Sequence, residues 1–412
     1  MTTAYLGGVS TSTFKLGAAA VSSILQGGGG PTTVRRMIGG GGIGAAQNRK
    51  SNGTNNSFNV SHRIWSPIPI TNPELSAQGF CYNSGAEFNL DNTVTLHGAI
   101  KGSDSIVYDC GTITVNPGDI DVRTSKLTGV TIPAGFIDII YHGTVPNGGF
   151  YYLTDYFRNA AKFWLMEEGV DLVDKTLSGT IGPGSNNLPA GFVGIIGDAP
   201  LAHRLIAIDG DSISVGVGGY GHPTIYTAIG ICAGYIVDRG TASYFHTGFA
   251  GAAAAQNKSN YAKRAAYMAS VGVTDTYCDL GVNDLNAASN AATLKADLIV
   301  LHDYIRSIVP GVKVWQSTIT PSTTVTGPPS SDTNQVVPSP INDGRRNTFN
   351  ADLRAGGLGT HITGFVEHAI PAQSTTNSDW WGIGYSNDGL HPLQAGGNAI
   401  VTAVSAANPM GL

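Results

Sequence analysis

The second half of the chain alternates strand-like and helix-like segments, and this rhythm limits the folds open to it. Apolar runs typical of buried strands occur at residues 205–208, 243–247, 276–280, 313–319 and 364–370. Stretches with helical periodicity separate them at 224–237, 252–271, 291–308 and 345–354, and another closes the chain at 392–407. Apolar strands that alternate with helices predict a parallel sheet covered on both faces. We therefore expect an α/β domain over residues 201–412, a doubly wound three-layer sheet of about five parallel strands.

The first half follows a different pattern. Between residues 56 and 200, short alternating runs at 93–100, 105–115 and 135–145 are separated by Pro-Gly, Asn-Gly and Gly-Ser breaks. Closely spaced strands with turn signals predict an antiparallel β-sandwich domain, similar in kind to a jelly roll. Residues 1–55 have little apolar periodicity and contain two runs of four glycines. We expect a flexible leader there, or a segment that becomes ordered against partner chains in a homo-oligomer.

The composition and net charge limit the classes of partner that the chain can bind and the compartments that suit it. The net charge is −5, so the chain has no basic footprint for nucleic acid or anionic lipid. No apolar run is long enough to span a membrane. Charged residues make up 12% of the chain and 56 residues are glycine, which resembles exported or virion proteins. An extracellular or virion-associated location is therefore favoured over the cytoplasm, although the first residues lack the basic start of a cleavable signal peptide.

Four cysteines are spread widely, at Cys81, Cys110, Cys232 and Cys278, and none forms a Cys-x-x-Cys pair. No metal site is therefore predicted, and no motif indicates a cofactor. Cys81 and Cys110 fall in the same region and are either two buried thiols or a disulfide formed in an oxidising compartment. Cys232 and Cys278 lie in apolar runs typical of core residues.

The chemistry is indicated by Asp388-Gly389-Leu390-His391 near the C-terminus. Across a glycine-containing turn, the carboxylate of Asp388 can reach one ring nitrogen of His391 and leave the other nitrogen free to face a serine. Ser212, in Gly210-Asp211-Ser212, directly follows the first predicted strand of the C-terminal domain. It does not lie in a Gly-x-Ser-x-Gly elbow, since position 214 is Ser. Together the three side chains are the parts of a nucleophile activated by a general base.

Two further residues follow neighbouring strands at the same predicted edge of the sheet. Gly251 comes after the second strand and Asn283 after the third. Glycine lets the backbone approach a ligand closely, and an asparagine amide donates hydrogen bonds without charge. Both are therefore candidates for stabilising the oxyanion of an acyl-transfer reaction. The alternatives are a helix-entry turn for Gly251, and an ordinary turn or a helix cap for Asn283.

In this order along the chain, Ser212, Gly251, Asn283 and Asp388-x-x-His391 resemble the SGNH (GDSL) hydrolase superfamily, over residues 201–412. The resemblance implies that Ser212 is the nucleophile and that Asp388 and His391 complete its triad. It also implies an oxyanion hole formed by three residues, which are Ser212 through its backbone N–H, Gly251 and Asn283. One position departs from the family pattern, because His246 stands where the second block usually has Asn, and Gly248 is the alternative to Gly251.

The resemblance implies a serine esterase acting on O-acyl esters, with O-acetyl groups on a carbohydrate as the expected substrate. A lipase, phospholipase or thioesterase would share the same residues. A virion or tail surface-recognition protein that retains the fold is a third interpretation. His222, Trp380, Trp381 and Tyr385 could line the substrate pocket, and for the three aromatic residues the alternative is packing that positions their loop. The insertion 321–341 is long for a connection within a domain and could form a rim or lid.

Overall fold

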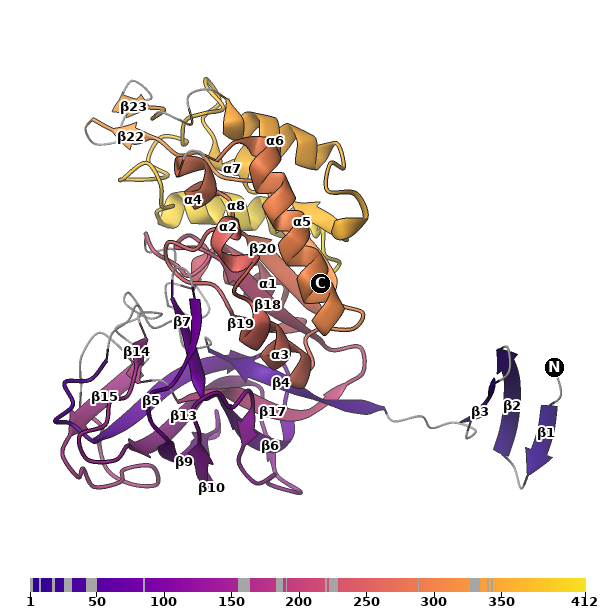
Figure 1. The fold of residues 1–412 in the computed structure, drawn as a ribbon, viewed down its shortest axis with the longest axis vertical. Coiled ribbons are helices and arrows are strands. Elements are labelled where there is room, and N and C mark those ends of the chain that lie inside the picture. Colours follow the sequence, from indigo (N-terminus) through magenta and orange to yellow (C-terminus); the bar gives the residue numbers. More distant parts are fainter. Residues whose placement is uncertain are drawn as a thin grey trace.

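The computed structural model describes most of the chain in two packed regions, one antiparallel and one with a parallel sheet (Figure 1). The described residues are 3–6, 9–16, 19–25, 32–41, 50–83, 86–154, 164–182, 188–189, 191–218, 221, 229–287, 289–326, 334–338, 341 and 344–412. The first strands, β1 (Thr3–Leu6), β2 (Val9–Leu16) and β3 (Ala19–Leu25), form an antiparallel sheet of their own.

Residues after 200 form the expected parallel sheet, in the order β19-β18-β20-β21-β24. Its strands are β18 (Arg204–Gly210), β19 (Ala242–His246), β20 (Asp275–Asp279), β21 (Lys313–Ser317) and β24 (Gly364–Val366). Every neighbouring pair runs parallel. All residues of β20 are buried, as expected for a strand covered on both faces. The prediction of five parallel strands is confirmed.

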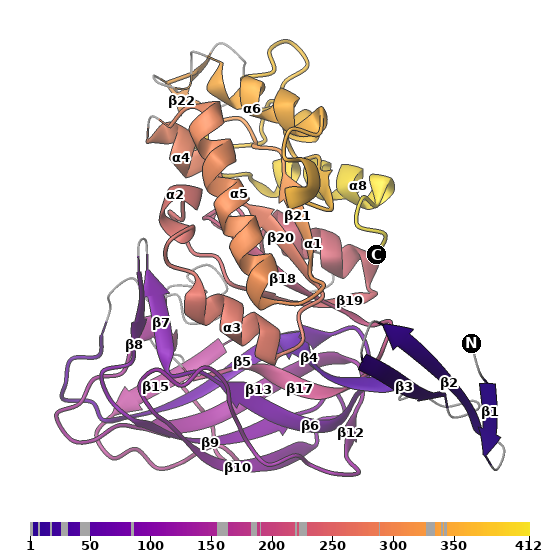
Figure 2. The same cartoon turned by 45° about the vertical axis from the view of Figure 1, so that its right-hand side comes forward.

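Helices cover both faces of this sheet. Figure 2 shows α3 (Ala262–Ser270) and α5 (Ala291–Ile308) on one side, and α1 (Gly230–Arg239) and α8 (Gln394–Ala407) on the other. The remaining helices are α2 (Ala254–Asn257), α4 (Val282–Asn286), α6 (Arg345–Arg354), η3 (Gly359–His361) and α7 (Ala369–Ala372). In such a fold the carboxyl ends of the strands form one open edge, where ligands bind.

The region before residue 200 consists mainly of two antiparallel sheets. In the first the strand order is β10-β9-β13-β5-β15, and in the second it is β11-β6-β17-β4, with β12 also paired to β6. Their bounds are β4 (Thr33–Gly40), β5 (Ser57–Ser66), β6 (Ile70–Ala77), β9 (Val94–Lys101), β10 (Val107–Val115), β11 (Val122–Arg123), β12 (Thr131–Ile132), β13 (Gly135–Thr144), β15 (Trp164–Gly169) and β17 (Phe192–Pro200). Buried side chains of both sheets, such as Val60 and Leu75, belong to one hydrophobic cluster. The antiparallel strands are as expected, and the sandwich remains an interpretation of them.

Short two-stranded pairings complete the chain. They are β7 (Phe80–Asn83) with β8 (Ala86–Asn89), β14 (Leu153–Thr154) with β16 (Leu188–Pro189), and β22 (Thr324–Val325) with β23 (Gln335–Val336). The last pair lies within the insertion 321–341.

Strand β4 corrects the prediction for residues 1–55. Thr33–Gly40 pairs with β17, and Met37 and Ile38 are fully buried. A Cβ on Gly39 would lie 2.6 Å from Cδ1 of Ile64, and one on Gly40 would lie 2.6 Å from Cβ of Phe245. The prediction of a leader is therefore wrong for this strand, because these glycines allow close packing rather than flexibility.

The two regions share a hydrophobic core and buried polar contacts. Met37, Phe80, Tyr82, Val193 and Ile196 of the antiparallel region belong to the same buried cluster as the parallel sheet. Nε of Arg264 in α3 lies 2.9 Å from Oε1 of Glu87, and both side chains are buried. The Arg264 guanidinium also lies 4.4 Å from the ring centre of Tyr82. The change of pattern near residue 200 is thus a change of topology within one packed body.

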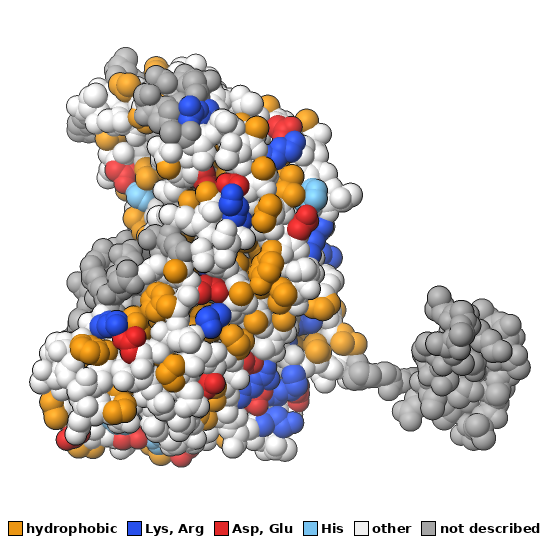
Figure 3. All heavy atoms as spheres, viewed as in Figure 1, with side chains coloured by type: hydrophobic (Ala, Val, Ile, Leu, Met, Phe, Trp, Pro, Cys, Tyr) orange, Lys and Arg blue, Asp and Glu red, His pale blue; other side chains and the backbone are white. Residues whose placement is uncertain are grey.

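On the face that Figure 3 shows, charged side chains are scattered among uncharged ones, in line with the 12% of charged residues in the chain. Within the described part of the chain, no helix is both long and apolar enough to cross a membrane. Cys81 and Cys110 are free, buried thiols, as are Cys232 and Cys278.

Candidate active site

Ser212 lies at the carboxyl edge of the parallel sheet, two residues after β18 ends at Gly210. The turn that follows is closed by hydrogen bonds from the N–H of Val217 to the carbonyl of Ser212 (2.9 Å) and from Oγ of Ser214 to the carbonyl of Asp211 (2.9 Å). Ser212 is 7% exposed, whereas Ser214 is fully buried. Of the two serines, only Ser212 faces the surface.

The histidine predicted to activate Ser212 lies beside it. Nε2 of His391 is 2.8 Å from Oγ of Ser212, although 179 residues separate them in sequence. Nδ1 of the same ring is 2.6 Å from Oδ2 of Asp388. One imidazole nitrogen therefore faces the hydroxyl and the other faces the carboxylate, which is the arrangement that a general base and its orienting group need.

Asp388 is held in its ionised form. Partial burial disfavours its charge, but hydrogen bonds from the His391 ring and from the backbone N–H of His391 and Leu390 outweigh burial and lower the pKa of Asp388. The two N–H groups donate to Oδ1 at 2.8 and 2.9 Å. The carboxylate can therefore fix the imidazole tautomer and stabilise an imidazolium.

Trp381 supports this turn from inside the protein. Its indole Nε1–H donates to the carbonyl of Gly389 at 2.9 Å, and its side chain is fully buried. The same carbonyl accepts from the N–H of Thr323 at 2.8 Å, so the insertion 321–341 is tied to the turn. Gln335 in β23 adds two hydrogen bonds to the Trp381 backbone.

The prediction that Trp381 contacts substrate is wrong, since it has no exposed surface. Its packing positions the loop, which was the alternative. Trp380 and Tyr385 are partly exposed on the same loop and remain candidates. His222 lies outside the described residues.

The candidate oxyanion donors meet at the same edge. No described residue accepts a hydrogen bond from the backbone N–H of Ser212 or Gly251, so both are available to a ligand. Gly251 has a φ of +86° and an exposed surface. The N–H of Gly248, the alternative, already donates to the carbonyl of Ile208 at 3.2 Å. A Cβ on Gly248 would lie 2.2 Å from the oxygen of Gly210, so its glycine is explained by packing.

Asn283, in α4, donates two hydrogen bonds through its amide nitrogen. Its Nδ2 donates to the carbonyl of Ala252 at 2.9 Å and to Oδ2 of Asp211 at 3.3 Å. The second contact is long for a hydrogen bond and therefore the weaker one. Asp211 is fully buried, and burial together with the nearby charge of Asp279 raises its pKa well above the ordinary value.

Asp284 organises the neighbouring turn. Its carboxylate accepts the N–H of Ala254 and of Ala255, both at 2.9 Å, at the start of α2. Ala252, which anchors the Asn283 amide, lies two residues before the first residue of this helix. Asp284 thus connects the loops that carry Gly251 and Asn283.

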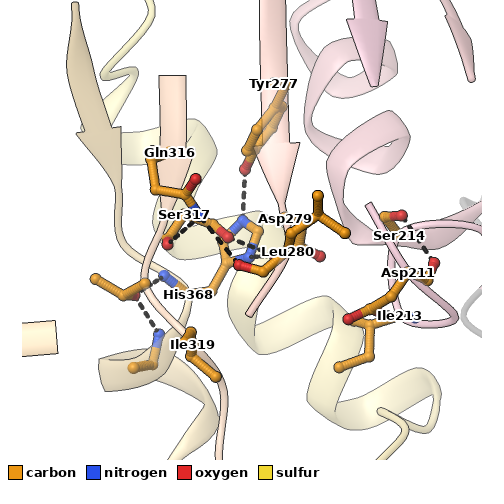
Figure 4. A network of polar contacts seen from close by, with 12 residues as sticks. Asp211, Ile213, Ser214, Tyr277, Asp279, Leu280, Gln316, Ser317, Ile319 and His368 are labelled. Carbon is orange, nitrogen blue, oxygen red and sulfur yellow. Dashed lines mark hydrogen bonds and ion pairs between the residues drawn. The ribbon is translucent and has the colours of Figure 1, made fainter. Parts of the chain in front are cut away.

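A buried polar network near Asp211 was not predicted from the sequence (Figure 4). Oδ1 of Asp279, at the end of β20, accepts from Oγ of Ser317 and lies 3.2 Å from Nδ1 of His368. Nε2 of His368 is 2.5 Å from the hydroxyl of Tyr277. These residues come from β20, from β21 and from the start of α7, and segments so far apart in the chain give no local sequence signal. His368 is fully buried, so this second Asp-His pair supports the strand ends and cannot meet substrate.

Among the described residues, no three His, Cys, Asp or Glu side chains gather in a way that could hold a metal ion.

No protein-family model matches the chain, and no curated protein matches it. Solved structures with a similar fold include GDSL-like lipases and carbohydrate esterases. A carbohydrate esterase family 2 enzyme with a carbohydrate-binding domain from Corynascus thermopiles (Myceliophthora fergusii) is 15% identical, with a TM-score of 0.36, and the alignment covers 92% of this chain and 100% of that one.

A family two carbohydrate esterase from Clostridium thermocellum, in complex with cellohexaose, is 15% identical with a TM-score of 0.34, covering 92% of this chain and 94% of that one. A GDSL-like lipase from Bacteroides thetaiotaomicron is 14% identical with a TM-score of 0.34, covering 51% of this chain and 89% of that one. Likenesses this distant do not show a shared activity.

Proposed function

We propose that this protein is a serine esterase that hydrolyses O-acyl esters, with Ser212 as nucleophile, His391 as general base and Asp388 as its orienting carboxylate. The observation that carries the proposal is the continuous contact from Oγ of Ser212 through both ring nitrogens of His391 to Asp388, at 2.8 and 2.6 Å. A serine hydroxyl is a weak nucleophile until such a base accepts its proton.

In the proposed mechanism, His391 takes the proton of Ser212 as Oγ attacks the ester carbonyl carbon. The resulting tetrahedral oxyanion accepts hydrogen bonds from the N–H of Ser212, the N–H of Gly251 and the amide of Asn283. Collapse of this intermediate breaks the bond to the alcohol oxygen, and His391 donates the proton to the departing alcohol. Water, activated by His391, then hydrolyses the acyl-enzyme in the same two steps and restores Ser212.

Asn283 enters this scheme by exchanging one hydrogen bond. Its 2.9 Å bond to Ala252 stays as the anchor, and the 3.3 Å bond to Asp211 is given up to the oxyanion. The 3.3 Å contact is the longer of the two and therefore the easier one to exchange. Burial and the nearby charge of Asp279 raise the pKa of Asp211 and so favour its protonated form, which is a weaker acceptor than a carboxylate.

We further propose a short acyl group, acetyl foremost, on a carbohydrate hydroxyl. Support comes from the bulk of Trp380 and Tyr385, which are partly exposed on the loop that leads to Asp388. Aromatic faces near the triad would limit acyl length and can stack on a sugar ring. A lipase or thioesterase would instead need an open acyl groove at this position.

Rates on p-nitrophenyl esters from acetyl to octanoyl test this proposal, with Ser212→Ala as the control. We expect the highest kcat/KM for acetyl and a fall beyond butyryl. Each added methylene gains about 0.8 kcal/mol when it is buried, so an open groove would make the rates rise with length. Rates that rise through octanoyl would replace the acetylesterase by a lipase or thioesterase, and no Ser212-dependent activity on any ester would remove both.

A further inference from the structure

A cavity of about 490 Å³ opens at the amino-terminal edge of the parallel sheet, opposite the edge that carries Ser212. It is lined by the turn 201–204, by the segments 272–275 and 309–311, and by Arg36 and Lys313. Arg36 belongs to β4, so the antiparallel region forms one wall and the starts of β18, β20 and β21 form the others.

The lining of this cavity carries more positive than negative charge. Arg204 is neutralised by Asp275, whose Oδ2 lies 2.9 Å from its Nε. The same carboxylate also accepts from Nε1 of Trp315 at 3.0 Å. Arg36 and Lys313 have no carboxylate within ion-pair distance in the part of the chain that the structure describes. Two positive charges therefore remain at the cavity.

The neighbour of Arg36 in β4, Arg35, has carboxylate partners. Arg35, on the other face of β4, is paired with Glu74 at 2.6 Å and with Asp198 at 3.0 Å. Arg36 donates through Nη1 to the carbonyl of His203, and none of the described residues accepts from its buried Nε. A buried guanidinium N–H without an acceptor is rare and costly. Desolvation accordingly lowers the pKa of Arg36.

No other wall residue supplies the missing negative charge. His203 is buried, and burial together with the adjacent Arg36 lowers its pKa to about 4, so the ring is neutral at pH 7. Its Nε2 lies 2.9 Å from Oγ of Ser243. The rim is apolar, with Leu201 59% exposed and Ala269 and Pro310 beside the opening.

We propose that this cavity binds an oxyanion, the carboxylate or phosphate group of a small ligand, between Arg36 and Lys313. The cationic floor pairs with the anionic group, and the apolar rim contacts the body that carries it. Arg204 and Gly210 are six positions apart along β18, or about 20 Å at the usual rise. The site is therefore separate from Ser212, and it does not rest on the proposed esterase function.

Binding to the full-length protein tests this inference, measured by calorimetry at low ionic strength. The probes are inorganic phosphate and D-glucuronate, with D-glucose as the neutral counterpart of the second. Arg36→Gln and Lys313→Gln each remove one cation, and Lys101→Gln removes one from β9 in the other sheet. Because Lys313 is exposed at the start of β21, its variant stays informative if Arg36→Gln fails to fold.

We expect at least one anionic probe to bind at millimolar concentration, and each cavity variant to weaken it about tenfold. Binding to Lys101→Gln and to Ser212→Ala should equal that of the wild type, and D-glucose should not bind. Preference for glucuronate would identify a carboxylate ligand, and preference for phosphate a phosphorylated one. Three results would overturn the site. Neither anion binds, or the cavity variants bind as tightly as the wild type, or Lys101→Gln loses as much affinity as the cavity variants.

Discussion

The carbonyl oxygen of Thr323 lies where a side chain on Gly389 would have to be: a Cβ at that position would be 2.1 Å away. Gly389 also has a φ of +78°, a conformation that L side chains rarely adopt. Because it sits between Asp388 and His391, the geometry of the proposed triad depends on this glycine. The insertion 321–341 thus acts on the site through the backbone.

Replacing Gly389 by alanine should displace the turn and separate His391 from Ser212. We expect kcat to fall by about 10²-fold or more, since small misplacements of catalytic groups have effects of this size. Gly384→Ala is the matched control, because its φ is +75° but a Cβ there would meet nothing within 4 Å. Steady-state kinetics on an acetyl ester would contradict this account if both variants lost activity equally.

Asn283→Ala should lower kcat by about 10²–10³-fold, the usual cost of losing one oxyanion donor. KM should change little, because the amide acts on the transition state. Asn92→Ala removes an amide of the antiparallel region, whose Nδ2 donates to the carbonyl of Phe150 at 3.0 Å, and should leave both constants unchanged. A variant at 283 that raised KM with kcat preserved would make Asn283 a substrate-binding residue.

Asp209 predicts a pH dependence of stability. It is buried, and burial raises its pKa to about 7, although the charge of Arg264 and the hydroxyl of Tyr261 favour the ionised form. The folded protein favours the protonated form of Asp209. The contribution of this residue to the free energy of unfolding is therefore most favourable below its pKa in the unfolded chain, and it is lost as pH rises through about 7. Urea unfolding of wild type and Asp209→Asn, from pH 4 to 8, should show a smaller loss in the variant, in which Asp211, with its raised pKa, still contributes. If Asp209→Asn lost as much stability as the wild type over this pH range, groups other than Asp209 would be responsible for the loss.

Glu87 and Arg264 should hold the two regions together. Glu87→Gln leaves the buried guanidinium uncompensated, and the free energy of unfolding should fall by about 3–5 kcal/mol. Glu167→Gln removes a more exposed pair with Lys175 and should cost below about 1 kcal/mol. Equal effects in urea unfolding would mean that the buried pair is not needed. Because the core is shared, residues 201–412 expressed alone should not fold.

Much of the parallel sheet could be predicted, because strands such as β18 are buried and contain a continuous apolar run, Leu205–Ile208. The candidate site followed from it, since Ser212, Gly251 and Asn283 each come after a strand of the same edge. β4 was missed because packed glycines resemble flexible ones in sequence. The full burial of Trp381 and the Asp279–His368 pair could not be foreseen, because both depend on contacts between distant segments.

The contact between His391 and Ser212 is the basis of the proposed function, and covalent labelling tests it most directly. A fluorophosphonate that reacts with activated serines should add once to the wild type, at Ser212, as located by peptide mass spectrometry. Ser212→Ala should not be labelled, and its turnover should fall by several orders of magnitude. Ser214→Ala should be labelled like the wild type, since the Ser214 hydroxyl is buried. Labelling at Ser214, or none at Ser212 in the folded protein, would contradict the assignment of the nucleophile.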